Sequence, residues 1–131
     1  MSEKHSEDFL RLADAAKARI RQVKPEEAAA LVQSGALLLD VREQDEFARD
    51  HIENAKHLSR GRLEMKIDSL APDKAQPIVC YCSGGNRGAL AADTLRQMGY
   101  TRVSSLAGGL KAWRAAHSDS AEQPSDNNSP A

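Results

Sequence analysis

Cys82 stands at the start of a short loop whose composition suits it to sulfur chemistry. The apolar run 78–81 precedes it, Gly84 and Gly85 follow it, and Arg87 opens a segment with helical periodicity. At a helix start, unpaired backbone N–H groups and the helix dipole favour an anion. Because glycine permits unusual backbone angles, several N–H groups can converge on one sulfur atom. We expect this cysteine to carry a thiolate near neutral pH and to act as a nucleophile.

The other residues of this loop are expected to act mainly through their backbone N–H groups. The Ser83 hydroxyl offers one further hydrogen bond to sulfur or to a substrate. If Gly85 needs a positive φ, a β-branched residue there would disrupt the loop. Arg87 is predicted to bind an anionic substrate or to stabilise an anionic sulfur intermediate, because the helix dipole otherwise makes a cation in the first turn slightly unfavourable. The predicted binding loop comprises Ser83, Gly84, Gly85, Asn86 and Arg87.

The second cysteine, Cys80, is predicted to be a small core residue of the strand that leads to Cys82. An extended Cys-x-Cys pair lies at or beyond the usual reach of a disulfide. The four histidines lack metal-ligand spacing, and the sequence contains no Cys-x-x-Cys motif. We therefore expect neither a metal site nor a cofactor.

The composition indicates one domain of ordinary size, with 131 residues of which 40% are hydrophobic. The chain has 18 basic and 19 acidic residues, so its charge gives no reason to expect nucleic acid or an anionic membrane surface as a partner. No apolar run approaches the roughly 20 residues of a membrane span. The first residues are polar and acidic, which predicts no secretory signal and a cytoplasmic location.

Predicted helices alternate with predicted strands along the chain. This order predicts an α/β fold with a central parallel sheet and helices on both faces. Ligands bind at the carboxyl ends of the strands in such folds, where Cys82 and the segment 40–42 would meet. The predicted helices cover residues 7–22, 25–35, 43–48, 63–70, 86–98 and 109–116, and the predicted strands cover 36–41, 55–58, 77–81 and 102–106.

The domain proper is predicted to span residues 23–117. Residues 1–22 are predicted to form an amphipathic helical extension that packs on this domain, because apolar residues recur there at helical spacing. Residues 118–131 are rich in Ser, Asp, Asn and Pro and contain almost nothing apolar. We predict that they form a disordered tail, since they cannot bury enough surface to offset the entropy of ordering.

Several separate motifs resemble the single-domain form of the rhodanese-like family. They lie between residues 23 and 116 in the order typical of that family, which makes the match more specific than one short motif. The matching segments are Leu38 to Arg42 with Glu46-Phe47, His51-Ile52 with Ala55, Ser59-Arg60-Gly61 with Leu63-Glu64, Val79 to Arg87, and Leu106 to Gly109 with Trp113.

The resemblance implies a rhodanese fold and a sulfurtransferase of the thiosulfate sulfurtransferase type. In this family, a cysteine attacks a sulfane sulfur donor, becomes a persulfide and passes the outer sulfur to a nucleophilic acceptor. Cys82 occupies the position of this nucleophile. The implied donor is a small anion such as thiosulfate, or a protein persulfide, and the implied acceptor is a thiol, or cyanide in vitro.

Three further residues are predicted to support the site. Arg60 matches the Arg-Gly pattern of the family and is the second candidate for binding an anion. Asp40 and Arg42 are expected to form an interaction that braces neighbouring loops, in preference to direct catalysis.

One segment departs from the family pattern, which usually reads Gly-His-Ile and then Gly-Ala. Here Asp50 precedes His51-Ile52, and Asn54 precedes Ala55. Asp and Asn tolerate tight turns and left-handed backbone better than most residues do. We therefore expect the turn to be retained.

Two other functions are compatible with the sequence. Phosphatases related by fold use a Cys-loop-Arg cradle with five intervening residues, whereas four residues separate Cys82 from Arg87. The shorter loop favours a sulfur atom over a phosphate group. The other alternative is a noncatalytic regulatory, sulfur-carrier or protein-interaction module. Many such domains lack the cysteine, and inertness of Cys82 to alkylation at neutral pH would favour that function.

Overall fold

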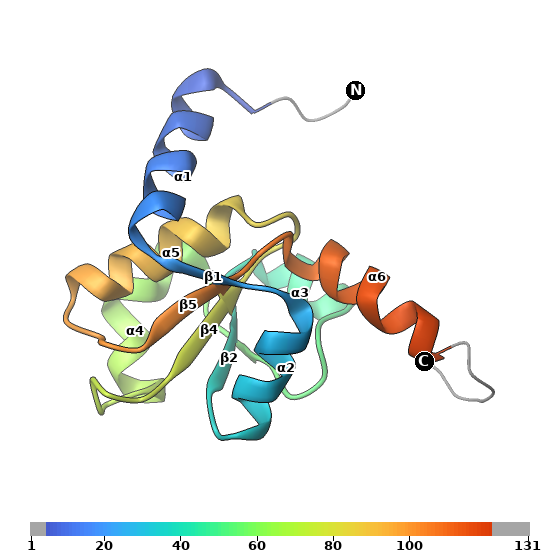
Figure 1. Cartoon of the computed structure of the whole chain (residues 1–131). Helices are drawn as coiled ribbons and strands as arrows, with labels where there is room; N and C mark the ends of the chain where they lie inside the picture. Colours follow the sequence, from blue (N-terminus) through green and yellow to red (C-terminus); the bar gives the residue numbers. More distant parts are fainter. Residues whose placement is uncertain (1–4, 122–131) are drawn as a thin grey trace.

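A parallel β-sheet forms the centre of the computed structural model, which describes residues 5–121. In that part of the chain the strands lie in the order β1-β5-β4-β2-β3, and each adjacent pair is parallel (Figure 1). The middle strand, β4, is buried throughout, as its continuous apolar run predicts. The strands are β1 (Arg21–Val23), β2 (Leu37–Asp40), β3 (Lys56–His57), β4 (Ile78–Tyr81) and β5 (Val103–Leu106).

Helices cover both faces of this sheet, which confirms the predicted α/β architecture. Side chains of α4 and α5, such as Ile67 and Leu95, form one core cluster together with Cys80. Side chains of α2 and α6, including Ala28 and Leu110, belong to a second cluster on the other face. The helices are α1 (Glu7–Arg19), α2 (Pro25–Gln33), α3 (Gln44–Arg49), α4 (Leu63–Leu70), α5 (Asn86–Gln97) and α6 (Gly109–Ala121), with the 3-10 helix η1 (Arg60–Arg62) before α4.

The predicted helix over residues 7–22 is wrong at its carboxyl end. α1 ends at Arg19, and the next residues form β1, which pairs with β5. Pro25 disfavours helical backbone for the residue before it, and pairing with β5 satisfies the backbone groups of β1. The strand has the sequence Arg-Gln-Val, in which only Val23 is apolar and buried. Its three residues therefore show no alternation of apolar and polar side chains that would predict a strand.

The other predicted elements are present, and all but the last helix have ends within two residues of the prediction. The sequence predicts that the last helix ends at residue 116, but α6 continues to Ala121 because no proline or glycine interrupts it. Residues 118–121 of the predicted tail therefore lie in a helix. Residues 122–131, like residues 1–4, lie outside the described part of the chain. In residues 5–121, no helix has the length and apolarity needed to cross a membrane.

The N-terminal helix packs on α5, as predicted, and its amino end projects from the domain (Figure 1). Ala13 and Ala16 are fully buried and lie three residues apart, so they share one face of α1. Arg19 at the end of α1 forms a two-pronged ion pair with Asp93 of α5, with a shortest N–O distance of 2.7 Å. Arg96 donates to the same carboxylate.

The Asp93 ion pair predicts a pH-dependent stabilisation. Hydrogen bonding by Arg19 lowers the pKa of Asp93 to about 2. Because the folded-state pKa is lowered, the stabilisation is present above about pH 4 and is lost as the pH falls through about 2. We expect Asp93→Asn to lower the free energy of unfolding by about 1 kcal/mol at pH 7, since solvent screens the half-exposed arginines.

Urea unfolding between pH 7 and pH 2 measures this effect, with Asp14→Asn on the exposed face of α1 as the control. The loss caused by Asp93→Asn should shrink as the pH falls. A loss of the same size over the whole range would contradict this role of the carboxylate.

Candidate active site

The loop that follows β4 places two backbone N–H groups on the Cys82 sulfur. Strand β4 ends at Tyr81, and α5 begins at Asn86. The Cys82 Sγ accepts hydrogen bonds from the N–H of Gly85 at 3.1 Å and from the N–H of Gly88 at 3.2 Å. The cysteine is only 2% exposed. The N–H groups of a helix's first turn have no partner within the helix, so the start of α5 can supply donors to the sulfur. Gly85 belongs to the predicted loop, whereas Gly88 lies one residue beyond it.

The geometry constrains two glycines of this segment and leaves a third unconstrained. Gly85 has a φ of +115°, in the left-handed region, which favours glycine. At Gly88 a Cβ atom would lie 3.2 Å from the backbone of Tyr81, so a side chain there would require the helix or the strand to shift by a few tenths of an ångström. At Gly84 a Cβ atom would meet no atom within 4 Å, and the φ there is not positive. Sequence reasoning missed Gly88.

The start of α6 holds the carbonyl groups of the same loop. Leu110 N–H donates to the Cys82 carbonyl at 2.7 Å, and Lys111 N–H donates to the Ser83 carbonyl at 3.1 Å. These carbonyl oxygens therefore bond to α6, while N–H groups of the loop bond to the sulfur. Gly109 makes this approach possible, because a Cβ there would lie 2.4 Å from the Cys82 carbonyl oxygen.

Arg87 is engaged by a carboxylate from another part of the chain. Its guanidinium donates to both oxygens of Glu46, at 2.7 and 3.1 Å, and to the Ser83 hydroxyl at 3.3 Å. The hydrogen bond from Arg87 lowers the pKa of Glu46 to about 2, so this carboxylate stays ionised at neutral pH. The arginine predicted to bind an anionic substrate thus already has an anionic partner.

A surface pocket, called here the Cys82 pocket, brings most of the predicted loop together with residues that the sequence did not indicate. Gly85 is buried beneath this surface. Lys111 comes from α6, Phe9 from the first turn of α1, and His5 from the segment just before α1. Nothing in the local sequence distinguishes these three residues as site residues. The Cys82 pocket is lined by Cys82, Ser83, Gly84, Asn86, Arg87, Glu46, Lys111, Phe9 and His5.

Arg60 lies in a neighbouring pocket. Phe9 and Arg87 line this pocket as well as the Cys82 pocket. The closest ionic partner of Arg60 in the described residues is Glu64, at 3.9 Å. Arg60 therefore lines a pocket next to the Cys82 pocket and is not among the residues that line the Cys82 pocket itself.

Asp40 and Arg42 form a buried ion pair at the end of β2. The guanidinium Nη2 lies 2.8 Å from the Asp40 carboxylate, and both side chains are at most 5% exposed. Arg42 also donates to the carbonyl of Asp50 at 2.6 Å, while the His57 ring contacts the Arg42 carbonyl at 2.7 Å. The pair links β2, the segment after α3 and β3. These contacts are those of residues that position loops.

The comparison with known families decides which class of protein this arrangement belongs to. The model of the rhodanese-like domain matches residues 24–116, which is most of the chain. The chain belongs to the rhodanese-like domain family. The thiosulfate sulfurtransferase GlpE of Coxiella burnetii (strain RSA 331 / Henzerling II) is 36% identical over 98 residues, covering 74% of this chain and 90% of that protein. This rhodanese-like chain is therefore an enzyme of the sulfurtransferase type.

Solved structures show the same rhodanese-like fold. The polysulfide-sulfur transferase homodimer of Wolinella succinogenes has a TM-score of 0.71 and 32% identity, covering 92% of this chain and 88% of that chain. A protein from Rhodopseudomonas palustris CGA009, described as a possible tyrosine phosphatase, has a TM-score of 0.76 and 32% identity. That match covers 88% of this chain and 96% of the other.

The turn that departs from the rhodanese family pattern is retained. Asn54 has a φ of 73° and is the non-glycine residue with positive φ in residues 5–121. This confirms that asparagine supports the turn in place of glycine. Asp50 is extended, with a φ of −170°, so its position does not require glycine. The N–H of Ile52 donates to the Tyr81 hydroxyl at 3.0 Å, which anchors the segment to β4.

Cys80 is a core residue, as predicted. It is fully buried, and its neighbours in the sheet register are Leu39 and Ser105. Burial, with a smaller contribution from Cys82, raises the pKa of the Cys80 thiol to about 12. Burial and the raised pKa favour the protonated thiol, in keeping with a core residue. In residues 5–121, no cluster of His, Cys, Asp and Glu is arranged to hold a metal ion.

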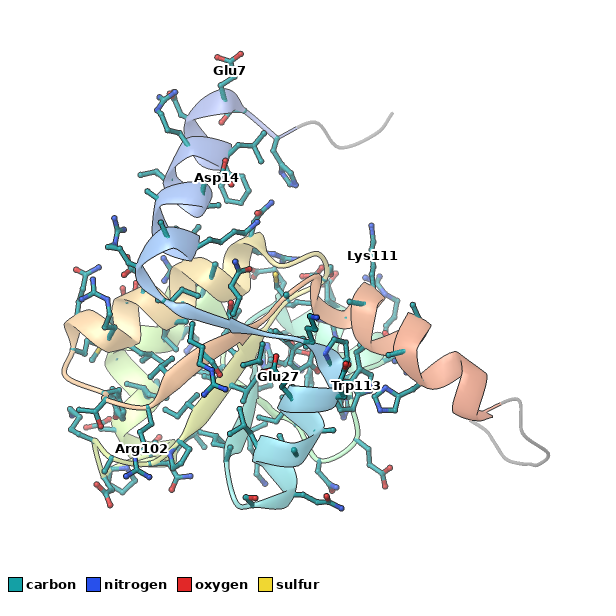
Figure 2. All side chains as sticks on the ribbon, in the orientation of Figure 1. Glu7, Asp14, Glu27, Arg102, Lys111 and Trp113 are labelled. Atoms are coloured by element: carbon teal, nitrogen blue, oxygen red, sulfur yellow. The ribbon has the colours of Figure 1, made fainter. Side chains whose placement is uncertain are left out.

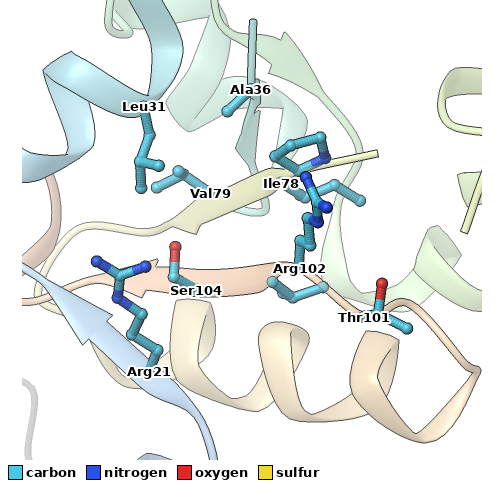
Figure 3. A pocket seen from close by; sticks show the side chains of 10 residues that line it. Arg21, Leu31, Ala36, Ile78, Val79, Thr101, Arg102 and Ser104 are labelled. Carbon is cyan, nitrogen blue, oxygen red and sulfur yellow. The ribbon is translucent and has the colours of Figure 1, made fainter. Parts of the chain in front are cut away.

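A second pocket lies at the opposite end of the sheet, near the amino ends of β4 and β5 (Figure 3). Leu31 and Val79 contribute to its apolar lining, and Arg21 and Arg102 also line it. It contains no cysteine. Because ligands of parallel α/β sheets bind at the carboxyl ends of the strands, the Cys82 pocket is the candidate active site.

Proposed function

We propose that this rhodanese-like domain transfers a sulfane sulfur from a donor such as thiosulfate to a thiophilic acceptor through a persulfide on Cys82. The observation that carries the proposal is the pair of N–H groups, from Gly85 and Gly88, directed at the Cys82 sulfur in an accessible pocket. The name of the Coxiella relative supports thiosulfate as the donor. The acceptor is a cellular thiol, with cyanide as its substitute in vitro.

The reaction proceeds in two displacements. The Cys82 thiolate attacks the outer sulfur of thiosulfate, the S–S bond of the donor breaks, and its electron pair leaves with sulfite. The acceptor then attacks the outer sulfur of the persulfide, and Cys82 leaves as a thiolate. The loop N–H groups stabilise the negative sulfur in both steps, and preorganised donors of this kind contribute a few kcal/mol each.

The persulfide places its charged atom farther from the backbone than the thiolate does. N–H groups of residues 86 and 87 belong to the first turn of α5 and have no partner within the helix by the geometry of an α-helix. They are the donors we assign to the outer sulfur, with the N–H of Gly88 shared between the two states.

Sulfite release in the absence of an acceptor tests this function. With thiosulfate alone, the protein should release about one sulfite per active chain and then stop. Addition of cyanide should restart the reaction and produce thiocyanate. A protein persulfide used in place of thiosulfate is the second donor to test. The proposed function would be contradicted if the protein transferred sulfur neither from thiosulfate nor from a protein persulfide.

The two alternatives have separate tests. The relative described as a possible tyrosine phosphatase justifies an assay with an aryl phosphate. We expect no hydrolysis that depends on Cys82, because only four residues separate Cys82 from Arg87, which makes a tighter loop than the five-residue cradle of phosphatases. A noncatalytic module would be indicated if iodoacetamide did not alkylate Cys82 at neutral pH.

The role of Arg87 is testable by releasing it from its carboxylate partner. Glu46→Gln removes the negative charge that forms the salt bridge with the Arg87 guanidinium. If Arg87 contributes to donor binding, the KM for thiosulfate should fall by about threefold to tenfold with little change in kcat. Glu26→Gln removes an exposed carboxylate in the first turn of α2, outside the residues that line the Cys82 pocket, and is the matched control. An unchanged KM in Glu46→Gln would remove Arg87 from the donor site.

We also propose a cytoplasmic location for this chemistry. The proposed reaction needs Cys82 as a free thiolate at the start of each cycle. A reducing compartment keeps thiols in this state.

A further inference from the structure

A backbone hydrogen bond from Lys111 holds this residue next to the catalytic loop. It lies in the first turn of α6, where its N–H donates to the Ser83 carbonyl at 3.1 Å. Its side chain is exposed, lines the Cys82 pocket and projects from the start of α6 away from the sheet (Figure 2). The cationic group is therefore carried on an element whose position relative to Cys82 is fixed by hydrogen bonds.

The charges around the Cys82 pocket leave Lys111 as the cation without an anionic partner among the described residues. Arg87 and Glu46 both line the pocket, and their two-pronged ion pair largely cancels their charges. Lys111 forms no salt bridge with any described side chain in residues 5–121. Besides the Cys82 thiolate that reacts, Lys111 therefore carries the charge at this pocket that no side-chain ion pair offsets.

Helix stability does not explain a lysine at this position. The positive end of a helix dipole makes a cation in the first turn unfavourable by a few tenths of a kcal/mol. Arg87 occupies the corresponding turn of α5, but Glu46 offsets its charge. The first turn of α6 contains no acidic residue that would do the same for Lys111.

We infer that Lys111 binds the sulfonate end of a thiosulfate-like donor and stabilises the sulfite that leaves. This inference rests on the proposed function and names the class of substrate for the same site: small donors in which the transferred sulfur is attached to a charged sulfur-oxygen group. The loop N–H groups bind the sulfur that is transferred. Lys111 binds the group that departs, onto which the electron pair of the broken S–S bond moves.

Two donors that differ in charge test this division of roles. Thiosulfate is a dianion, whereas methanethiosulfonate is a monoanion that transfers its outer sulfur by the same bond cleavage and releases methanesulfinate. In Lys111→Met, we expect the KM for thiosulfate to rise about tenfold and the KM for methanethiosulfonate to rise about threefold or less. Lys111→Arg should restore most of the binding of thiosulfate.

Salt and product inhibition give readouts that a purely structural role would not change. In the unchanged protein the KM for thiosulfate should rise with ionic strength, and this rise should be smaller in Lys111→Met. Inhibition by sulfite should weaken in the same variant. Lys66→Met removes an exposed lysine of α4 outside the residues that line the Cys82 pocket, so it is the matched control.

The outcomes separate the inference from the function on which it rests. If Lys111→Met is active and its KM for thiosulfate equals that of the unchanged protein, the inference is wrong and the proposed function stands. Equal increases in KM for both donors would also overturn it. If the unchanged protein transfers sulfur from a protein persulfide but from neither of these two anions, the inference is wrong and the proposed function stands. If it transfers sulfur from none of the three donors, the proposed function fails and the inference fails with it.

Discussion

Replacing Cys82 by serine is expected to abolish sulfur transfer, with kcat/KM falling by at least about a thousandfold. A serine hydroxyl is not ionised near neutral pH and cannot form a persulfide. The fold should persist, because the smaller oxygen occupies the same site below the N–H groups of Gly85 and Gly88. Thiocyanate formation from thiosulfate and cyanide measures the loss.

The second cysteine provides the matched control for this substitution. Cys80→Ser should retain most of the activity, because Cys80 is fully buried and its raised pKa keeps it protonated. Equal rates for the unchanged protein, Cys82→Ser and Cys80→Ser would show that thiocyanate forms without the enzyme. If Cys80→Ser lost activity while Cys82→Ser kept it, the assignment of the nucleophile would be contradicted.

Gly109→Ala is expected to impair both stability and activity, although residue 109 carries no reactive group. Its Cβ would lie 2.4 Å from the Cys82 carbonyl oxygen and 2.7 Å from the Ser83 carbonyl carbon, and its φ of +61° already disfavours a side chain. Backbone must therefore move, and the N–H groups of α6 would lose the loop carbonyls. We expect a loss of about 1 to 3 kcal/mol in the free energy of unfolding.

The effect of Gly109→Ala on catalysis follows from the displaced loop. A shift of about 1 Å in a catalytic group can reduce the rate on the order of a hundredfold, and we expect a loss of that size in kcat. Gly84→Ala is the control within the same loop, because a Cβ there meets no atom within 4 Å. Urea unfolding and sulfite release should distinguish the two variants. Similar losses in both would contradict the role assigned to the start of α6.

The sequence predicts the local part of this site well. A buried strand, two glycines and the start of a helix follow one another without interruption, so the position of Cys82 and the donor at Gly85 can be inferred from neighbouring residues. The second donor, Gly88, is not indicated by the loop and depends on how closely α5 approaches β4. The positive φ of Gly85 and the left-handed turn at Asn54 are likewise local properties of the backbone. The order of strands and helices predicts the α/β architecture for the same reason.

The features that the sequence does not predict depend on contacts between distant segments. Strand β1 exists because it pairs with β5, and its three residues carry no periodic signal of their own. Glu46 lies 41 residues before Arg87, so no local sequence pattern indicates that the two side chains form an ion pair. Lys111 differs from other exposed lysines only because α6 bonds to the loop carbonyls.

The central claim is that Cys82 accepts and holds a transferred sulfur. Mass spectrometry of the Cys80→Ser variant after incubation with thiosulfate, without an acceptor, tests it most directly, because the peptide then contains a single cysteine. The account predicts one additional sulfur atom on the peptide that carries Cys82, and its removal when cyanide is added. Failure to find that sulfur after incubation with thiosulfate, methanethiosulfonate or a protein persulfide would contradict the account.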